Sequence, residues 1–246
     1  MTAAIDPFLD ETFVGRFNRR RHEDDSVNTC VDEPAIVDRV RALAPQSIVE
    51  LGCGTGGLTS VLAAHSPQVL SVDQSPAMIE HANSEVNATN VRFVCSRFEE
   101  FVPPTKPDAV VSGMALHLVA DLSSLCRSVY GWLEPGGTFI FSQRHPIRTA
   151  NAHGDELSRI KPSWTVSDYF DVGARTYQWL GYDVGYYHRT VSDIVASVID
   201  AGFRLNEIAE PMPFDHRHTD RGAENCSSPS VLLIRCWKPN QSGDER

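Results

Sequence analysis

The chain is short of basic residues. It has 22 Lys and Arg residues against 32 Asp and Glu residues, and its formal net charge at pH 7 is −10. A basic cluster at residues 19–22 is followed directly by acidic residues at 23–25, which neutralise it locally. Proteins that bind nucleic acid usually present a broad positive surface to the phosphates. We therefore expect no nucleic-acid partner.

The sequence also lacks any apolar run long enough to span a bilayer, and its start, MTAAID, has neither a basic nor an apolar segment of the kind that opens a signal peptide. Its 6 cysteines are scattered without a C-x-x-C pair. Scattered cysteines of this kind favour buried thiols in a reducing compartment. We expect a cytoplasmic protein without a membrane segment, and the sequence does not indicate its oligomeric state.

Metal-ligand spacing is missing as well. Residues 215–220, DHRHTD, offer suitable side chains, but no third partner stands at a diagnostic distance along the chain. A polar loop between the last two strands explains this segment better. We expect no metal.

What the sequence does have is a glycine-rich turn directly after a strand. Residues 47–51 read as a hydrophobic strand, residues 52–56 as the turn and residues 57–65 as a helix. Glycine in such a turn lets a ligand approach the backbone closely, and the helix directs free N–H groups toward it. The arrangement predicts a nucleotide-like ligand.

Two kinds of ligand fit this turn. Gly52, Gly54 and Gly57 match G-x-G-x-x-G, and Asp73 ends the next strand, where dinucleotide-binding folds place a ribose-binding acid. Glu50 favours a different ligand, because its carboxylate would repel a pyrophosphate but suits a positively charged ammonium. S-adenosylmethionine carries an ammonium and no phosphate.

Three segments resemble motifs of the class I S-adenosylmethionine-dependent methyltransferases. ELGCGTG at residues 50–56 resembles the first motif, SVDQSPAM at 71–78 the second, and LEPGGTF at 133–139 the turn before the fifth strand. They occur in the family's order over residues 45–143. The resemblance implies S-adenosylmethionine as cofactor and a methyl acceptor as partner.

Two further segments, FSQRHPI at residues 141–147 and YHRT at 187–190, resemble a bacterial small-molecule branch of the same family. The implied activity is methyl transfer to an oxygen, nitrogen or carbon of a small molecule. Two alternatives stay open. The chain could use S-adenosylmethionine without methyl transfer or as a cofactor-binding module, or, more remotely, it could be an NAD(P)-dependent oxidoreductase.

The alternation of strand and helix patterns predicts an α/β fold with a Rossmann-like, doubly wound and mostly parallel sheet. The expected strands lie near 47–51, 68–73, 91–95, 108–112 and 137–143, and the expected helices near 34–44, 57–65, 76–88 and 121–133. A helix from Thr190 to about Ala201 then precedes two strands, at 203–210 and 229–237. These strands predict a C-terminal antiparallel hairpin at the sheet edge, which a plain NAD-binding domain lacks.

We expect one domain with four parts. They are N-terminal cap helices at 1–44, a cofactor-binding core at 45–143, an aromatic-rich lid insertion at 144–189, and the last helix with the terminal strands at 190–246.

The resemblance implies a role for each residue around the cofactor. Asp73 would accept hydrogen bonds from both ribose hydroxyls, and Glu50 would orient the methionine ammonium directly or through water. The other expected contacts are Gly52, Cys53 and Gly54 on the methionine part, Gln74 and Met78 beside the adenine, Ser112 beneath the sulfonium, and Asn28 with Phe17 over the methionine part.

The adenine end departs from the family pattern. Arg97 stands where many members have an Asp that accepts from the adenine amino group, and an arginine cannot accept a hydrogen bond. We expect Arg97 to stack on the ring or face solvent, with Phe98 contacting adenine through its backbone.

Acceptor recognition is expected in the lid insertion, which is rich in large aromatic residues. Such a surface suits a flat aromatic acceptor, and it would hold an amine by cation–π attraction. The expected contacts are Phe17, Trp164, Tyr169, Trp179, Tyr186 and Tyr187. The alternative is that these rings form a small core of the lid itself.

Two histidines are candidate general bases. His145 stands at the carboxyl end of the fifth strand, where ligands gather in open α/β sheets, and His188 precedes the last helix. Substrate positioning or a structural hydrogen bond are the alternatives for each. His117, after the fourth strand, is interpreted as a half-buried packing residue.

Overall fold

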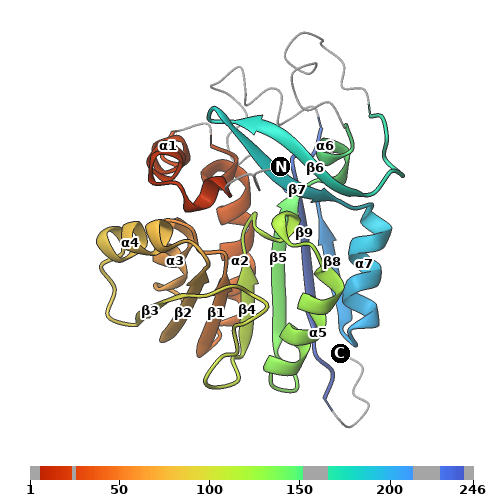
Figure 1. Ribbon diagram of the computed structural model, residues 1–246. Coiled ribbons are helices and arrows are strands. Elements are labelled where there is room, and N and C mark those ends of the chain that lie inside the picture. The colour runs from red at the N-terminus through yellow and green to blue at the C-terminus, as the bar shows by residue number, and fades with distance from the viewer. Residues whose placement is uncertain (1–5, 24–25, 152–165, 213–227, 241–246) are drawn as a thin grey trace.

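A computed structural model of the chain describes residues 6–23, 26–151, 166–212 and 228–240 (Figure 1). Its centre is a seven-stranded sheet with the order β3-β2-β1-β4-β5-β9-β8. These strands are β1 (Ser47–Leu51), β2 (Gln68–Asp73), β3 (Val91–Cys95), β4 (Ala109–Ser112), β5 (Thr138–Arg144), β8 (Arg204–Ala209) and β9 (Val231–Trp237).

Strands β1 to β5 are parallel, and β9 is antiparallel to both β5 and β8. The predicted doubly wound sheet and its terminal antiparallel hairpin are both confirmed. The chain fills one side of the sheet with β1, β2 and β3 and then returns to place β4 beside β1. Ligands of open α/β sheets bind outside the carboxyl ends of the strands at such a switch point.

Helices cover both faces of the sheet, and each face has its own apolar core. Helices α5 (Leu122–Trp132) and α7 (Val191–Asp200) pack on one face, together with Phe139 and Phe141 of β5. Helices α2 (Glu33–Leu43) and α3 (Gly57–Leu62) pack on the other. Helix α4 (Pro76–Glu85) contacts β2 and β3.

Local sequence explains where two of the helices begin. The Ser75 hydroxyl accepts from the backbone N–H of Met78 at the start of α4, and Pro76 occupies the first turn, where a missing N–H costs nothing. At the start of α7, Thr190 and Asp193 form a complete capping box.

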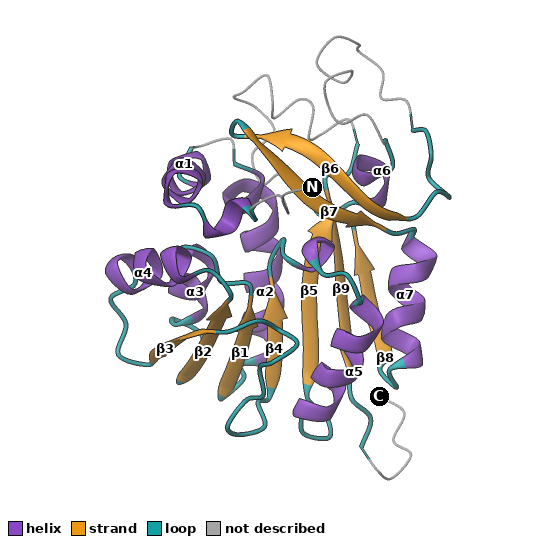
Figure 2. Cartoon of the chain, viewed as in Figure 1, coloured by secondary structure: helices purple, strands orange, loops and turns teal. Residues whose placement is uncertain are grey.

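A second layer lies at the end of the sheet toward which the parallel strands point (Figure 2). From the N-terminal segment it contains η1 (Pro7–Leu9), α1 (Glu11–Arg21) and a short π-helix, η2 (Asn28–Asp32). After β5 the chain adds a one-turn helix, α6 (Pro146–Thr149), and a hairpin of β6 (Gly173–Trp179) and β7 (Tyr182–His188). We call α1 together with the β6–β7 hairpin the roof.

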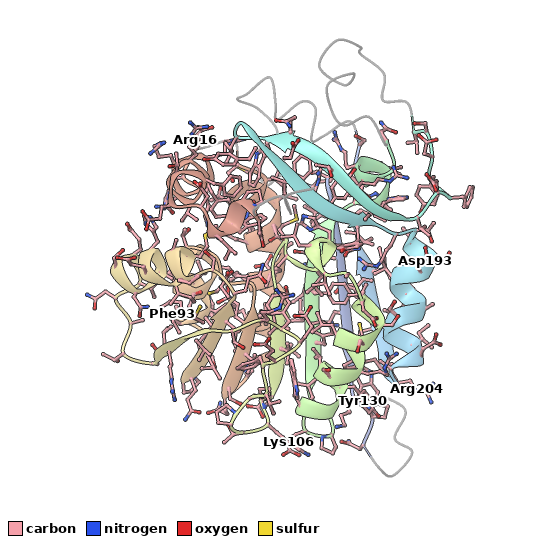
Figure 3. All side chains as sticks on the ribbon, in the orientation of Figure 1. Arg16, Phe93, Lys106, Tyr130, Asp193 and Arg204 are labelled. Carbon is pink, nitrogen blue, oxygen red and sulfur yellow. The ribbon has the colours of Figure 1, made fainter. Side chains whose placement is uncertain are left out.

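Aromatic rings join the two parts of the roof. Trp179 packs edge-on against Phe13 and Phe17, with ring centroids 5.7 Å apart in each case. The Tyr182 hydroxyl donates to Asp10, and Arg16 donates to the Leu180 carbonyl of the hairpin turn at 2.8 Å. Figure 3 shows Arg16 beside the hairpin, at the end of the molecule opposite Lys106 and Arg204.

Within the described ranges, no helix is long and apolar enough to cross a membrane. The same part of the chain contains no group of three or more His, Cys, Asp or Glu side chains able to hold a metal ion. Residues 215–220, considered above as metal ligands, lie outside the described residues.

Candidate active site

A cavity of about 580 Å³ lies between the carboxyl ends of the parallel strands and the roof. This volume falls within the range of about 300–1,000 Å³ that is typical of small-molecule sites. One part of the cavity is lined by the glycine-rich turn and the ends of β2 and β3. The other part is lined by the loop after β4, the end of β5, α6 and the β6–β7 hairpin.

The glycine-rich turn presents bare backbone to the cavity. Gly52 and Gly54 both have positive φ, at +74° and +53°, which a side chain would strain. A Cβ on Gly52 would overlap the Cβ of Ala115, and a Cβ on Gly54 would lie 3.7 Å from the Phe17 ring. Gly52, Cys53 and Gly54, the residues expected to contact the methionine part, all line the cavity.

Asp73 ties this turn to the next strand. Its carboxylate accepts from the backbone N–H of Gly54 and from that of Ser75, both at 2.9 Å. Burial raises the pKa of Asp73, and the N–H groups of Ser75 and Gly54 oppose that rise. Since each carboxylate oxygen has two lone pairs, acceptor capacity remains toward the cavity, which Asp73 lines.

The expected adenine contacts also reach the cavity. Gln74, Met78, Arg97 and Phe98 all line it. Gln74 is held by Asp6, which accepts from its side-chain amide at 2.9 Å. Arg97 lies 3.5 Å from Glu99 near the cavity mouth, so its charge is shared with a neighbouring carboxylate.

Glu50 is placed differently from our expectation. Its carboxylate accepts from the hydroxyls of Thr59 at 2.5 Å and Ser71 at 2.7 Å, and it is not among the residues that line the cavity. Burial raises its pKa. These contacts argue against direct contact with an ammonium, and they assign Glu50 to joining β1, β2 and α3 beneath the turn.

Ser112 is likewise buried behind the cavity wall, where its hydroxyl donates to the Leu51 carbonyl at 2.8 Å. The lining at this point comes instead from Gly113, Met114 and Ala115 just beyond it. The contact expected of Ser112 beneath the sulfonium stays a prediction about its backbone, because its side chain bonds to the neighbouring strand β1.

Phe17 and Asn28 of the N-terminal segment line the cavity above the turn, and their expected contact with the methionine part stays a prediction. Sequence reasoning missed Arg21, whose guanidinium pairs with Glu33 and lies where a Cβ on Gly57 would be. The first turn of α3 is therefore covered by an arginine. A pyrophosphate bound in the manner of a dinucleotide would need that place.

The hairpin aromatics divide into two groups. Trp179 and Tyr187 line the cavity, together with Tyr177. Tyr186 is buried and donates to the Thr149 carbonyl, while the Tyr169 hydroxyl accepts from Val191 N–H. Tyr169 and Tyr186 thus belong to the lid's own packing, contrary to our expectation, and Trp164 lies outside the described residues.

His145 lies outside the cavity lining. Its Nδ1 accepts from the Ile147 N–H at 3.2 Å, which makes it the N-cap of α6, and its Nε2 lies 2.8 Å from Glu210. Burial lowers its pKa. With both ring nitrogens engaged, His145 has no free lone pair for a substrate proton, and its position argues against the predicted role as a base.

Both ring nitrogens of His188 also have hydrogen-bond partners. Its Nε2 donates to the Tyr169 carbonyl at 2.9 Å, and its Nδ1 lies 2.7 Å from the Thr149 hydroxyl. The side chain is buried and does not line the cavity. It joins the end of β7 to α6, which is the structural alternative considered from the sequence.

A structural role for His145 predicts different results for two substitutions. His145→Ala removes the N-cap and should cost about 1 kcal/mol of stability, whereas His145→Asn keeps a good cap and should restore most of it. Thermal unfolding measures both. Neither variant should alter cofactor affinity. Equal loss of turnover in both, with a changed pH profile, would instead restore the base assignment, since neither carries an imidazole.

The histidine that does line the cavity is His117, in η3 (Leu116–Leu118). It is 5% exposed, and its Nδ1 is buried without a hydrogen-bond partner. Burial, followed by the charges of Arg144 and Arg189, lowers its pKa to about 3, so the imidazole is neutral at pH 7. Sequence reasoning had interpreted it as a packing residue.

Arg144 and Arg148 also line the cavity and were missed. A usable signal was present, because side chains on a strand alternate between faces and Arg144 is the neighbour of His145. In the segment QRHP, at residues 143–146, the sequence prediction named the histidine and not the arginine beside it.

A second buried acid, besides Glu50, stands behind the cavity wall. Asp32, at the end of η2, is 1% exposed, and its Oδ1 has no hydrogen-bond partner. Its pKa is raised to about 7: burial raises it most and the charge of Glu33 adds to the rise, while a hydrogen bond from Ser142 and the charge of Arg21 oppose it.

This raised pKa predicts a pH-dependent loss of stability. The folded protein holds the Asp32 proton up to about pH 7, whereas an ordinary Asp releases it near 3.8, so stability falls as pH rises between these values. The Asp32→Asn side chain cannot ionise, so the Tm of this variant should rise relative to that of the wild type as pH increases through this window. The corresponding difference in the free energy of unfolding is up to about 4 kcal/mol. Asp38→Asn, on the exposed side of α2, should show no such trend.

The site as a whole fits an adenosine cofactor without a phosphate. A bare glycine turn and an acid at the end of β2 suit the methionine part and the ribose, and Arg21 covers the place where a pyrophosphate would sit. The fold and this site define a doubly wound protein of the kind that binds S-adenosylmethionine.

Comparisons with known proteins agree. A family model described as a methyltransferase domain matches residues 49–141. An S-adenosylmethionine dependent methyltransferase from Mesorhizobium loti is 30% identical, with a TM-score of 0.70 and coverage of 82% of this chain and 96% of its own. A Listeria monocytogenes protein assigned to the same group is 30% identical, with a TM-score of 0.75 and coverage of 85% and 97%.

Among curated relatives, the trans-aconitate 2-methyltransferase of Methylobacterium radiotolerans is 30% identical over 48% of this chain. The chain spans 44% of the length of that relative. Because two solved relatives match at 30% identity along nearly their whole length, the chain belongs to the S-adenosylmethionine-dependent methyltransferases. It is an enzyme that uses S-adenosylmethionine, and the oxidoreductase alternative is wrong.

Proposed function

We propose that the enzyme methylates a small molecule bound between the cofactor and the roof. The observation that carries this proposal is the continuity of the cavity, which runs from the glycine-rich turn to the β6–β7 hairpin. A volume of about 580 Å³ suits small ligands. The trans-aconitate 2-methyltransferase among the relatives is named for a small acceptor, which supports the same class here.

Each residue of the cofactor half has a proposed task. Asp73 accepts from the two ribose hydroxyls while its N–H bonds hold the turn, and the backbone at Gly52 to Gly54 follows the methionine part. Gln74, Met78, Arg97 and Phe98 surround the adenine. Asn28 and Phe17 cover the methionine part from above.

Bound S-adenosylmethionine supplies an activated methyl group, whose bond to sulfur breaks with both electrons staying on the sulfur. The protein's task is to hold the acceptor atom in line at about 3 Å and to exclude water. The aromatic contacts between Phe17, Trp179 and the rest of the roof serve that exclusion.

Calorimetry with S-adenosylhomocysteine, followed by mass spectrometry of turnover mixtures, tests the proposal. A product one methylene heavier than a small acceptor, formed together with S-adenosylhomocysteine, supports it. An acceptor converted while S-adenosylmethionine stays intact would favour a reaction other than methylation. Turnover confined to protein or RNA would overturn the small-molecule class.

A further inference from the structure

The half of the cavity proposed for the acceptor is lined, within the described residues, by charged side chains of positive sign alone. Its described lining comes from the loop after β4, the end of β5, α6 and the hairpin, and it includes Arg144 and Arg148 but no acidic side chain. The acids that line the cavity are Asp6, Asp73 and Glu99, on the cofactor side. In a chain with a net charge of −10, this local positive potential is a distinct feature.

Arg144 is oriented by aromatic rings. Its guanidinium lies 4.4 Å from the ring centroid of Tyr177 and 5.6 Å from that of Tyr186. Stacking on a ring holds a guanidinium in one plane without removing its charge. A planar, oriented guanidinium suits a carboxylate, which it can bind through two parallel hydrogen bonds.

Arg148 has a different task. Its Nη2 donates to the Ser228 carbonyl at 3.2 Å, and its Nε lies 3.4 Å from the Pro229 carbonyl, so it anchors the chain that enters β9. It adds positive potential to this half of the cavity, and Arg144, whose guanidinium is stacked on Tyr177, is the residue assigned to the ligand.

His117 supplies the second, independent observation. It lines the same half, and its buried Nδ1 has no hydrogen-bond partner. A buried polar atom without a partner costs free energy that a ligand atom can recover. Burial lowers the pKa of His117 most, and the positive charges of Arg144 and Arg189, which lower it further, would also attract an anion.

We infer that His117 and Arg144 form a recognition site for a carboxylate group on the methyl acceptor. This inference rests on the proposed function and names its substrate class as small carboxylic acids, with an aromatic or other apolar body to contact Trp179 and Tyr187. His117 donates the single N–H of its neutral imidazole to one carboxylate oxygen, and Arg144 binds the group through its guanidinium. Neither residue needs to move a proton.

Paired acceptors test the inference directly. The probes are 4-hydroxybenzoate, 4-hydroxyphenylacetate and 4-hydroxycinnamate, which offer a phenol oxygen to the methyl group while the carboxylate is bound, each with its primary amide, and phenylphosphonate as a second anion for binding. They are given to the enzyme with S-adenosylmethionine for turnover, and to the enzyme saturated with S-adenosylhomocysteine for binding by calorimetry. We expect the carboxylates to bind and react, and the amides to do so at least tenfold less well, because a charged hydrogen-bonding partner is lost.

Four variants assign the effect to the two residues. Arg144→Gln and His117→Leu should each raise KM for the acids roughly tenfold to a hundredfold. Arg144→Lys keeps the charge, and His117→Asn keeps a side-chain amide near the Nδ1 position, so each should restore part of the loss. Arg204→Gln removes the same charge from an exposed residue of β8 at the far end of the molecule (Figure 3) and should leave KM unchanged.

The outcomes separate this inference from the proposed function. S-adenosylhomocysteine should bind all variants with wild-type affinity, and loss of that binding in the wild type would refute the cofactor assignment instead. Equal or better use of the amides, unchanged KM in Arg144→Gln and His117→Leu, or acids that neither bind nor react would overturn the carboxylate site. Preference for phenylphosphonate over every acid would overturn the choice of carboxylate.

Discussion

Asp73→Ala should weaken binding of S-adenosylmethionine by at least a hundredfold. The carboxylate is the acceptor proposed for two ribose hydroxyls, and hydrogen bonds to charged groups contribute about 1.5–3 kcal/mol each. The substitution also frees the Gly54 N–H, which Asp73 holds at 2.9 Å, and so loosens the glycine-rich turn. Isothermal titration with S-adenosylmethionine and S-adenosylhomocysteine measures the loss.

Asp108→Ala is the matched control. Asp108, just before β4, accepts from the backbone N–H groups of Gln46 and Ser47 at 2.9 and 3.0 Å, just as Asp73 accepts from two backbone donors. Both variants should therefore lose stability, but the Asp108 variant should keep its cofactor affinity. Equal affinities in the two variants would show that Asp73 contributes to stability and not to cofactor binding.

Gly52→Ala should abolish measurable cofactor binding. Its φ of +74° costs an L-residue about 1–2 kcal/mol, and the added Cβ would overlap the Cβ of Ala115. To relieve that overlap the turn must shift, and the backbone that follows the cofactor shifts with it. Calorimetry measures affinity, and thermal unfolding measures the accompanying loss of stability.

Two comparisons separate the causes. Gly136, in the turn before β5, has a similar φ of +86°, and a Cβ added there would lie 3.3 Å from Asn240. Gly136→Ala should therefore lower stability without affecting cofactor affinity. Adding Ala115→Gly to Gly52→Ala removes the overlap and should recover part of the affinity. Undiminished binding in the single variant would mean that the turn does not approach the ligand.

The cofactor half of the site was predictable because its residues come from short segments at the ends of parallel strands. Gly52 to Gly54 follow β1, and Asp73 ends β2, which pairs with β1 in parallel register. Once the sheet is known to be parallel, these ends must meet at one edge. Glu50 belongs to the same segment, yet the direction of its side chain depended on Thr59 and Ser71.

The acceptor half was much less predictable. Arg144 and His145 are neighbours in the sequence, but only the arginine lines the cavity. The histidine side chain caps α6 instead. For His188 the deciding contact was Thr149, on a helix formed 39 residues earlier in the chain. A residue type can be read from a sequence, but its partners cannot when they are distant.

The amino-acid sequence by itself determined the sheet, its terminal antiparallel strands and the position of the cofactor turn. Alternating apolar strands, capping residues and glycines at positive φ are local requirements, and local sequence satisfies them. Tertiary structure decided which histidine and which arginines line the cavity. That choice depends on burial and on hydrogen bonds between segments far apart in the chain, which exist only after the roof has packed over the sheet.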